Sequence, residues 1–118
     1  LYETGVPFIF MNAVGTQGDL TTMVHEAGHA VHSFLTRGLP LNEHKSVPSE
    51  IAEVASMSME LLTMPGWGLF YENAEDLRRA RLQQVVRTLT LLPWIACVDA
   101  FQFWLYDHPT HTRAERRA

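Results

Sequence analysis

Residues 19–37 read DLTTMVHEAGHAVHSFLTR and predict the element around which the rest of the chain is organised. Apolar side chains recur in this stretch at the three- and four-residue spacing of an amphipathic helix. They are Leu20, Met23, Val24, Ala27, Ala30, Val31 and Phe34. Thr16 or Asp19 can cap the start of such a helix, and Gly38 and Pro40 are signals for its end. We therefore predict a largely buried helix over about residues 19–37.

Inside this helix, His25-Glu26-Ala27-Gly28-His29 has the form H-E-x-x-H. Residues four apart lie on the same helical face, so His25 and His29 can converge on one metal ion about 2.0 to 2.1 Å from each ring nitrogen. Glu26 projects beside that pair, where it can take a proton from water on the metal without being a ligand. The pattern predicts a zinc site, with two core histidines that bind no metal as the alternative.

Two neighbouring positions refine this prediction. Gly28 in the middle of a helix costs about 1 kcal/mol relative to alanine, so we expect the backbone of another element to come close there. His32 lies on the face of the two ligands, and we interpret it as lining the cleft or supporting a ligand rather than coordinating. A metzincin would carry Gly three residues and His six residues after the second histidine. His32 and Leu35 occupy those places and exclude that class.

A catalytic zinc site needs a third protein ligand, and the second predicted helix, over residues 49–64, supplies three candidates. Glu50, Glu53 and Glu60 are spaced so that they share one stripe of this helix. A row of partly buried glutamates requires a cation or histidines to compensate its charge, although a solvated face is the alternative. The opposite side is predicted to be a core face made of Ile51, Val54, Ala55, Leu61 and Leu62.

The remaining sequence predicts a mainly α architecture with one short strand. The apolar run at residues 7–14 is rich in β-formers and closes on Gly15, which predicts a strand that must pair with something outside this chain. A third helix is predicted over residues 73–106, with a kink or break at Pro93. Thr112 and Glu115 have the form of a capping box, so another helix is expected to start at residue 112.

Composition and charge limit the classes of function. The chain has 118 residues, of which 47% are hydrophobic and 19% charged, as expected for one soluble folded domain. Its net charge of -4 argues against a surface for nucleic acid. Pro93, Asp99 and Gln102 interrupt the apolar stretch at 88–106, which predicts a buried helix rather than a membrane span. Cys97 is the single cysteine and cannot form an internal disulfide, so we expect a reducing, cytoplasmic environment. We interpret Cys97 itself as an inert thiol in the core.

Two motifs together resemble a known family. The segment His25-Glu26-Ala27-Gly28-His29-Ala30-Val31-His32, followed by Ala52-Glu53-Val54-Ala55-Ser56-Met57-Ser58-Met59-Glu60, resembles the zinc-binding core of the oligoendopeptidase F and thimet-oligopeptidase family. The stretch from Phe8-Ile9-Phe10-Met11-Asn12 to Gly15-Thr16 and Asp19 is similar to the sequence that leads into that family's active-site helix. The resemblance covers nearly the whole chain.

The resemblance implies roles for particular residues. His25 and His29 would be ligands of one Zn²⁺, Glu53 the third ligand and Glu26 the general base. Glu60 would at most support a ligand, and Glu50 and His32 remain candidates for the same role or for the cleft wall. The predicted strand could pair with an extended substrate, and its candidate contacts are Met11, Asn12, Ala13 and Gly15.

Members of that family are much longer, and their catalytic channel lies between largely helical halves. Because this chain begins at Leu1 and closes just after a capping box, we expect residues 1–118 to be a single partial catalytic domain. We further expect the isolated segment to be poorly active or inactive and to self-associate, because the rest of the peptidase chain would cover its apolar faces.

These observations favour a zinc endopeptidase that hydrolyses short peptides. Three other readings remain open: a zinc-stabilised helical interaction module, a catalytically silent fragment of the peptidase, and a zinc amidase that acts on a non-peptide substrate. Metal content tests the first, peptide cleavage the second and a panel of substrates the third.

Overall fold

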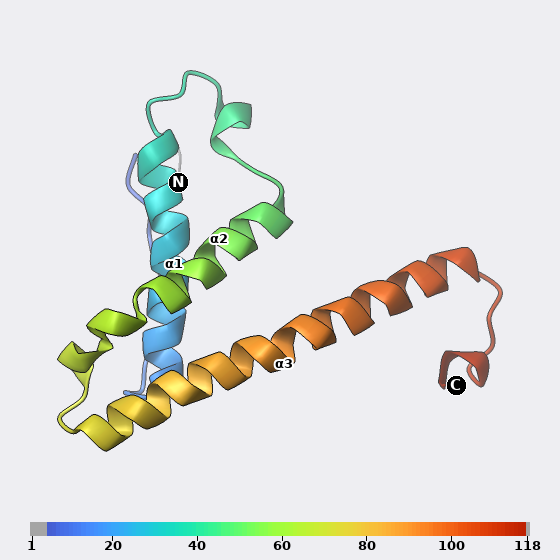
Figure 1. The fold of residues 1–118 in the computed structure, drawn as a ribbon. Coiled ribbons are helices and arrows are strands. Elements are labelled where there is room, and N and C mark those ends of the chain that lie inside the picture. Colours follow the sequence, from blue (N-terminus) through green and yellow to red (C-terminus); the bar gives the residue numbers. More distant parts are fainter. Residues whose placement is uncertain (1–4, 118) are drawn as a thin grey trace. The chain divides into compact units, whose positions relative to one another are not determined.

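The computed structural model describes residues 5–117, and these are mainly helical (Figure 1). The α-helices are α1 (Gln17–Thr36), α2 (Ser49–Leu62) and α3 (Ala74–Asp107). Short 3-10 helices are η1 (Asn42–Lys45), η2 (Met64–Phe70) and η3 (Glu115–Arg117). The chain divides into two compact units, one that ends at Arg81 and one that begins at Leu82.

A capping box begins α1 in the first unit. The Asp19 backbone N–H donates to the Thr16 hydroxyl at 3.3 Å, and the Asp19 carboxylate accepts from the Thr16 N–H at 2.7 Å. Thr16 is therefore the cap and Asp19 the third helical residue, so α1 starts two residues before the predicted position. The backbone N–H groups of Thr16 and Val14 hold the pKa of the Asp19 carboxyl below its usual value, because they stabilise the charged form.

Helices α1 and α2 cross where Gly28 faces Ser56 (Figure 1). A β-carbon added to Gly28 would lie 2.9 Å from the Cα of Ser56 and 3.1 Å from the Cγ of Met59. The predicted approach of another backbone at Gly28 is thus confirmed. Ser56 is 0% exposed at this crossing, because its small side chain fits where a larger one would separate the helices.

The predicted core face of α2 is wrong. Its members Ile51, Val54, Ala55, Leu61 and Leu62 are all exposed among the described residues. The buried residues of α2 are Ser56 and Glu60, which belong to the side that packs on α1. The close approach of α1 and α2 at Gly28 requires a small residue on the contacting side of α2. Ser56 therefore lies in the interface in place of a larger apolar side chain.

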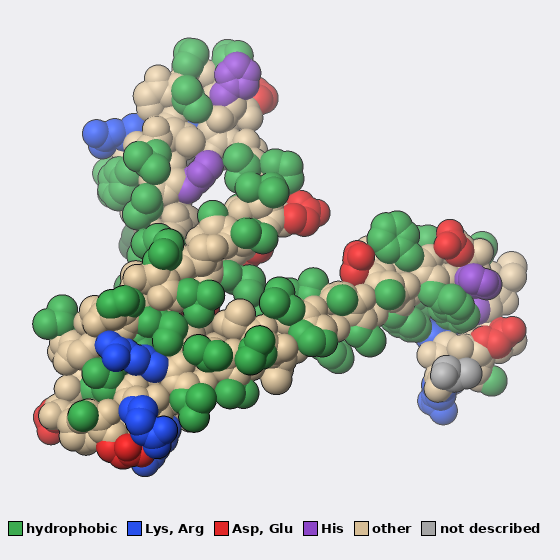
Figure 2. All heavy atoms as spheres, in the orientation of Figure 1, with side chains coloured by type: hydrophobic (Ala, Val, Ile, Leu, Met, Phe, Trp, Pro, Cys, Tyr) green, Lys and Arg blue, Asp and Glu red, His purple; other side chains and the backbone are tan. Residues whose placement is uncertain are grey.

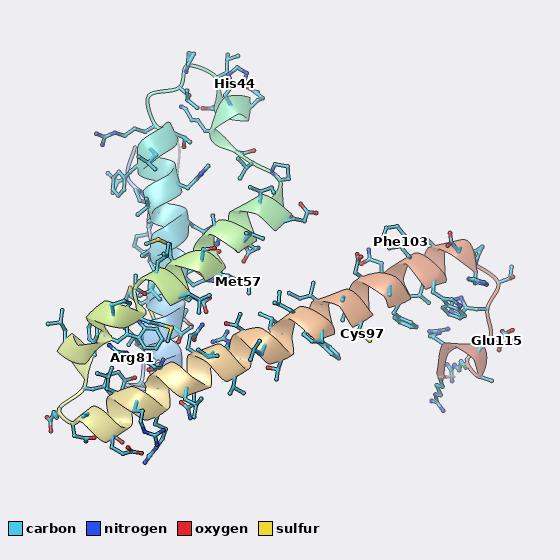
Figure 3. The ribbon with its side chains drawn as sticks, viewed as in Figure 1. His44, Met57, Arg81, Cys97, Phe103 and Glu115 are labelled. Carbon is cyan, nitrogen blue, oxygen red and sulfur yellow. The ribbon has the colours of Figure 1, made fainter. Side chains whose placement is uncertain are left out.

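Trp67 anchors the turn that follows α2. Its ring is 1% exposed, and its indole N–H donates to the Thr63 hydroxyl at 3.3 Å. The guanidinium of Arg81, labelled in Figure 3, donates to the carbonyls of Met64 and Pro65 at 3.2 and 3.1 Å. The Arg81 guanidinium thus satisfies two carbonyl groups of η2. Consequently α2 ends at Leu62 and continues into η2 instead of reaching residue 64.

The predicted strand at residues 7–14 does not form, and no strand occurs within residues 5–117. Phe10 is 88% exposed in this segment, and Phe8 and Val14 are also exposed. A strand needs a neighbour for its backbone N–H and C=O groups, and the described part of the chain offers none. The predicted substrate contacts Met11, Asn12, Ala13 and Gly15 therefore lie in an irregular segment, in which Gly15 adopts a φ of 83°.

In the second unit, α3 is continuous through Pro93, so of the predicted kink or break at this residue the break does not occur. Trp104 stacks on Phe101 and on His108, with ring centroids 6.0 and 5.0 Å apart. After the helix, Thr112 and Glu115 form the hydrogen bonds of a capping box, since the Glu115 backbone N–H donates to the Thr112 hydroxyl at 3.3 Å and the Thr112 N–H donates to the Glu115 carboxylate at 2.7 Å. The backbone N–H of Thr112 lowers the pKa of Glu115.

The expected burial of this part of α3 is also wrong. Hydrophobic side chains lie over its surface (Figure 2), and Cys97, expected as a core thiol, is exposed. No element of the second unit's described residues packs against this face, which is why it stays open to solvent. By length and composition α3 is the one described helix that could cross a membrane. The core helix of a soluble protein meets the same criteria.

The crossing generates a prediction for Gly28→Ala. Alanine favours a helix by about 1 kcal/mol over glycine, but its methyl group here requires α1 and α2 to separate. We expect a net loss of about 1 to 3 kcal/mol in the free energy of unfolding of the full-length protein, measured with urea. Gly18→Ala is the control, because its β-carbon would meet only the Thr16 hydroxyl at 3.5 Å. Equal stability of both variants would contradict the tight crossing.

Candidate metal centre

Three predicted ligand residues come together between α1 and α2. His25 and His29 lie one turn apart on α1, and Glu53 lies on α2. The Nε2 atom of His25 is 3.1 Å from one Glu53 carboxylate oxygen, and the Nε2 atom of His29 is 3.5 Å from the other. One ligand atom from each residue lies within 4.8 Å of the other two. The structure thus selects Glu53 from the three glutamates as the one that meets both histidines.

The helix crossing explains why Glu53 reaches them. Ser56 touches α1 at Gly28, and Gly28 lies between the two histidines in sequence. Glu53 precedes Ser56 by three residues, so it leaves α2 about one turn from the contact. Its side chain is 53% exposed, against 21% for His25 and 33% for His29. The group therefore sits in the helix interface with one side open to solvent.

A buried carboxylate orients the first histidine. The Nδ1 atom of His25 is 2.8 Å from Glu60 Oε1, and the Glu60 side chain is only 7% exposed. A carboxylate accepts but cannot donate when ionised, so we assign the proton to Nδ1. The Nε2 atom of His25 then carries the lone pair that faces Glu53. This arrangement gives Glu60 the supporting contact that the resemblance allowed for it.

The donor set fits a zinc ion. Two imidazoles and one carboxylate are a known ligand set of catalytic zinc sites, which leave a fourth position open. Tetrahedral bonds of about 2.0 to 2.2 Å place two ligand atoms roughly 3.3 to 3.5 Å apart. Each histidine lies near a different oxygen of the Glu53 carboxylate, at 3.1 and 3.5 Å, and one ligand atom from each residue lies within 4.8 Å of the other two, so small side-chain adjustments would let one ion bind all three. The exposed side of Glu53 leaves room for water or a substrate at the open position.

The other candidates lie apart from this group or beside it. Glu50 is exposed in the first turn of α2 and forms no ion pair with any described residue. The Nε2 atom of His32 lies 3.1 Å from the Lys45 carbonyl, so this ring ties η1 to α1. Glu26 is half-buried and follows His25 directly in α1.

Sequence reasoning assigned no role to Ser56. Its hydroxyl donates to the Glu53 carbonyl at 3.0 Å and lies 3.3 Å from the Nε2 atom of His25. Ser56 thus packs against α1 and also contacts two of the candidate ligands. A small residue near Glu53, together with the expectation that another backbone comes close to Gly28, was the available clue. Helical periodicity alone does not tell which small residue of α2 lies at the crossing.

Comparisons with known proteins give a consistent result. The model of peptidase family M3 matches residues 1–118. The chain is 42% identical over 59 residues to the chromosomal oligoendopeptidase F of Lactococcus lactis subsp. cremoris. This match covers 50% of this chain and 10% of that protein. It is 41% identical over 56 residues to the oligopeptidase PepF of Bacillus subtilis strain 168, or 48% of this chain and 8% of the relative.

A longer match is found with the plasmid-encoded oligoendopeptidase F of Lactococcus lactis subsp. cremoris, with 37% identity over 82 residues. That match covers 69% of this chain and 13% of the relative. The aligned part of the chain therefore spans about a tenth of the length of these relatives. No solved structure gives a significant match.

The geometry generates a prediction that compares two glutamates. Glu53→Ala removes the carboxylate that meets both histidines, whereas Glu50→Ala removes an exposed carboxylate with no described ion pair. We expect Glu53→Ala to reduce the zinc content of the purified full-length protein strongly and Glu50→Ala to leave it unchanged. Zinc per chain, measured by elemental analysis after dialysis, checks this. Equal losses, or a loss only in Glu50→Ala, would overturn the assignment.

Proposed function

The chain belongs to peptidase family M3, and from this premise we propose that it forms the catalytic core of a zinc-dependent endopeptidase that hydrolyses short peptides. One observation carries the proposal: one ligand atom each from His25, His29 and Glu53 lies within 4.8 Å of the other two, and Glu26 follows the first histidine on the same helix. The names of the relatives, oligoendopeptidase F and oligopeptidase PepF, support short peptides as the class of substrate.

Zinc, when bound, supplies a Lewis acid that polarises the scissile carbonyl and makes water more acidic. The residues of the chain then have separate tasks. His25, His29 and Glu53 hold the ion, and Glu60 keeps the His25 ring oriented through Nδ1. The Glu26 carboxylate accepts a proton from the attacking water and passes it to the nitrogen of the leaving amine.

The surroundings of the ligands suit this division of tasks. The more buried ligand, His25, is held by a buried carboxylate, which favours a fixed ring position. The most exposed ligand is Glu53, so the open side of the site faces solvent along α2. A peptide can approach from that side without displacing the helix crossing. The remaining parts of a complete active site, including groups that stabilise the oxyanion, belong on this proposal to the rest of the peptidase chain.

Glu26→Gln tests the chemistry. Glutamine keeps the size and hydrogen-bonding capacity of the side chain but cannot accept the proton of water. The full-length variant should therefore keep its zinc and lose at least about two orders of magnitude in turnover of a quenched fluorescent peptide. Glu72→Gln, at an exposed position between η2 and α3, is the matched control and should cleave normally. A zinc-loaded Glu26→Gln protein with normal turnover would disprove the mechanism.

A further inference from the structure

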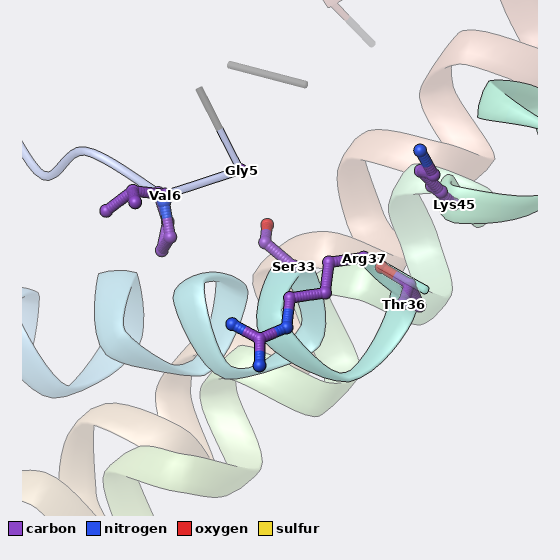
Figure 4. A pocket seen from close by; sticks show the side chains of 7 residues that line it. Gly5, Val6, Ser33, Thr36, Arg37 and Lys45 are labelled. Atoms are coloured by element: carbon purple, nitrogen blue, oxygen red, sulfur yellow. The ribbon is translucent and has the colours of Figure 1, made fainter. Parts of the chain in front are cut away.

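A pocket of about 270 Å³ lies at the C-terminal end of α1, between the segment before the helix and η1 (Figure 4). Its lining combines two apolar residues, two cations and two hydroxyl groups. They are Val6, Pro7, Arg37, Lys45, Ser33 and Thr36, and Gly5 completes the wall. This volume holds one or two amino-acid residues rather than a whole drug-sized ligand.

The polar groups of the pocket define the ligand that it can take. Arg37 forms no ion pair with any described carboxylate, and Lys45, whose ammonium donates to the Asn42 side-chain oxygen at 3.1 Å, supplies a second positive charge to the lining of the pocket. Ser33 donates its hydroxyl proton to the His29 carbonyl and Thr36 to the His32 carbonyl, at 3.1 and 2.9 Å. Both hydroxyl oxygens therefore keep lone pairs that can accept a hydrogen bond. The pocket thus offers positive charge for an anion and acceptors for a nearby N–H group.

The pocket also has a defined relation to the candidate metal centre. His25, His29, Ser33 and Arg37 are spaced four residues apart on α1, so they form one row along the helix. At 1.5 Å per residue, Ser33 lies about 6 Å and Arg37 about 12 Å beyond His29 along the axis. An extended peptide advances about 3.3 Å per residue. A peptide held at the metal centre would therefore reach Ser33 about two residues and Arg37 about four residues further along.

We propose that this pocket binds the C-terminal residue of the peptide substrate, with its carboxylate on Arg37 and Lys45. The inference rests on the proposed peptidase function. The N–H of that residue meets the hydroxyl oxygens, and its side chain packs on Val6 and Pro7. A phosphate group would match the cations but would bring no N–H for the two acceptors, so a peptide end is the better fit. The site favours substrates that end two to four residues after the cleaved bond.

The test compares peptides that differ only at the C-terminus. A short peptide with a free carboxylate and the same peptide as its amide are titrated into full-length Glu26→Gln protein, and both are offered to the wild type for cleavage. We expect the acid to bind about ten- to a hundredfold more tightly, the range of a hydrogen bond to a charged group. Arg37→Gln should reduce that ratio toward one, and Arg37→Lys, which keeps the charge, should retain part of it.

Arg78→Gln is the control for net charge, because Arg78 pairs with Glu75 on α3 at 2.9 Å and does not line the pocket. Equal affinity for acid and amide, or an equal loss of preference in Arg78→Gln, would overturn the inference. Displacement of the peptide acid by millimolar acetate as effectively as by the unlabelled peptide would also overturn it, since the pocket would then take any small carboxylate.

The two proposals can fail separately. Cleavage of peptides by the wild type without a preference for the acid would disprove the proposed role of the pocket and leave the proposed peptidase function intact. Tighter binding of the acid that depends on Arg37, without any cleavage by the wild type, would support the pocket as a carboxylate site and disprove the proposed peptidase function.

Discussion

The close contact between the backbones of α1 and α2 is the constraint on which the site depends. Gly28 lies against Ser56, and a single added methyl group would come within 2.9 Å of the opposite Cα. His25 and His29 flank this contact on α1, and Glu53 and Glu60 flank it on α2. One tight crossing therefore sets the distances among four side chains at once. A wider separation would move both glutamates away from the histidines together.

The interface formed by this crossing is polar as well as tight. Ser56 and Glu60 are its buried residues on α2, and the side chains of Ile51, Val54, Leu61 and Leu62 on the same helix face solvent. Burying a carboxylate is costly unless a partner compensates it, and His25 supplies that partner to Glu60 at 2.8 Å. The pairing has a functional consequence, because it fixes which nitrogen of the ring faces Glu53. Packing and chemistry are thus served by the same few residues.

Local patterns predicted most of the helical structure. The helix at α1, the capping residues Thr16 and Thr112, and the close approach at Gly28 are all found in the structure, but α1 is not largely buried as predicted, because Met23, Val31 and Phe34 are exposed. The errors concern interactions with partners. Residues 7–14 have strand-forming side chains, but a strand requires a neighbouring strand, and the described residues contain none. Likewise, Ile51, Leu62 and Cys97 were expected in a core, yet no described element covers them.

By itself, the sequence determined that two histidines lie on one helical face beside Glu26, because a spacing of four residues has that consequence in any helix. It also limited the candidates for a third ligand to a row of glutamates on the next helix. Only the tertiary structure decided that Glu53 meets both histidines, that Glu60 holds the His25 ring and that Ser56 lies at the contact. The physical reason is that periodicity defines positions around one helix axis, whereas the distance between two helices depends on which small residues allow their backbones to touch.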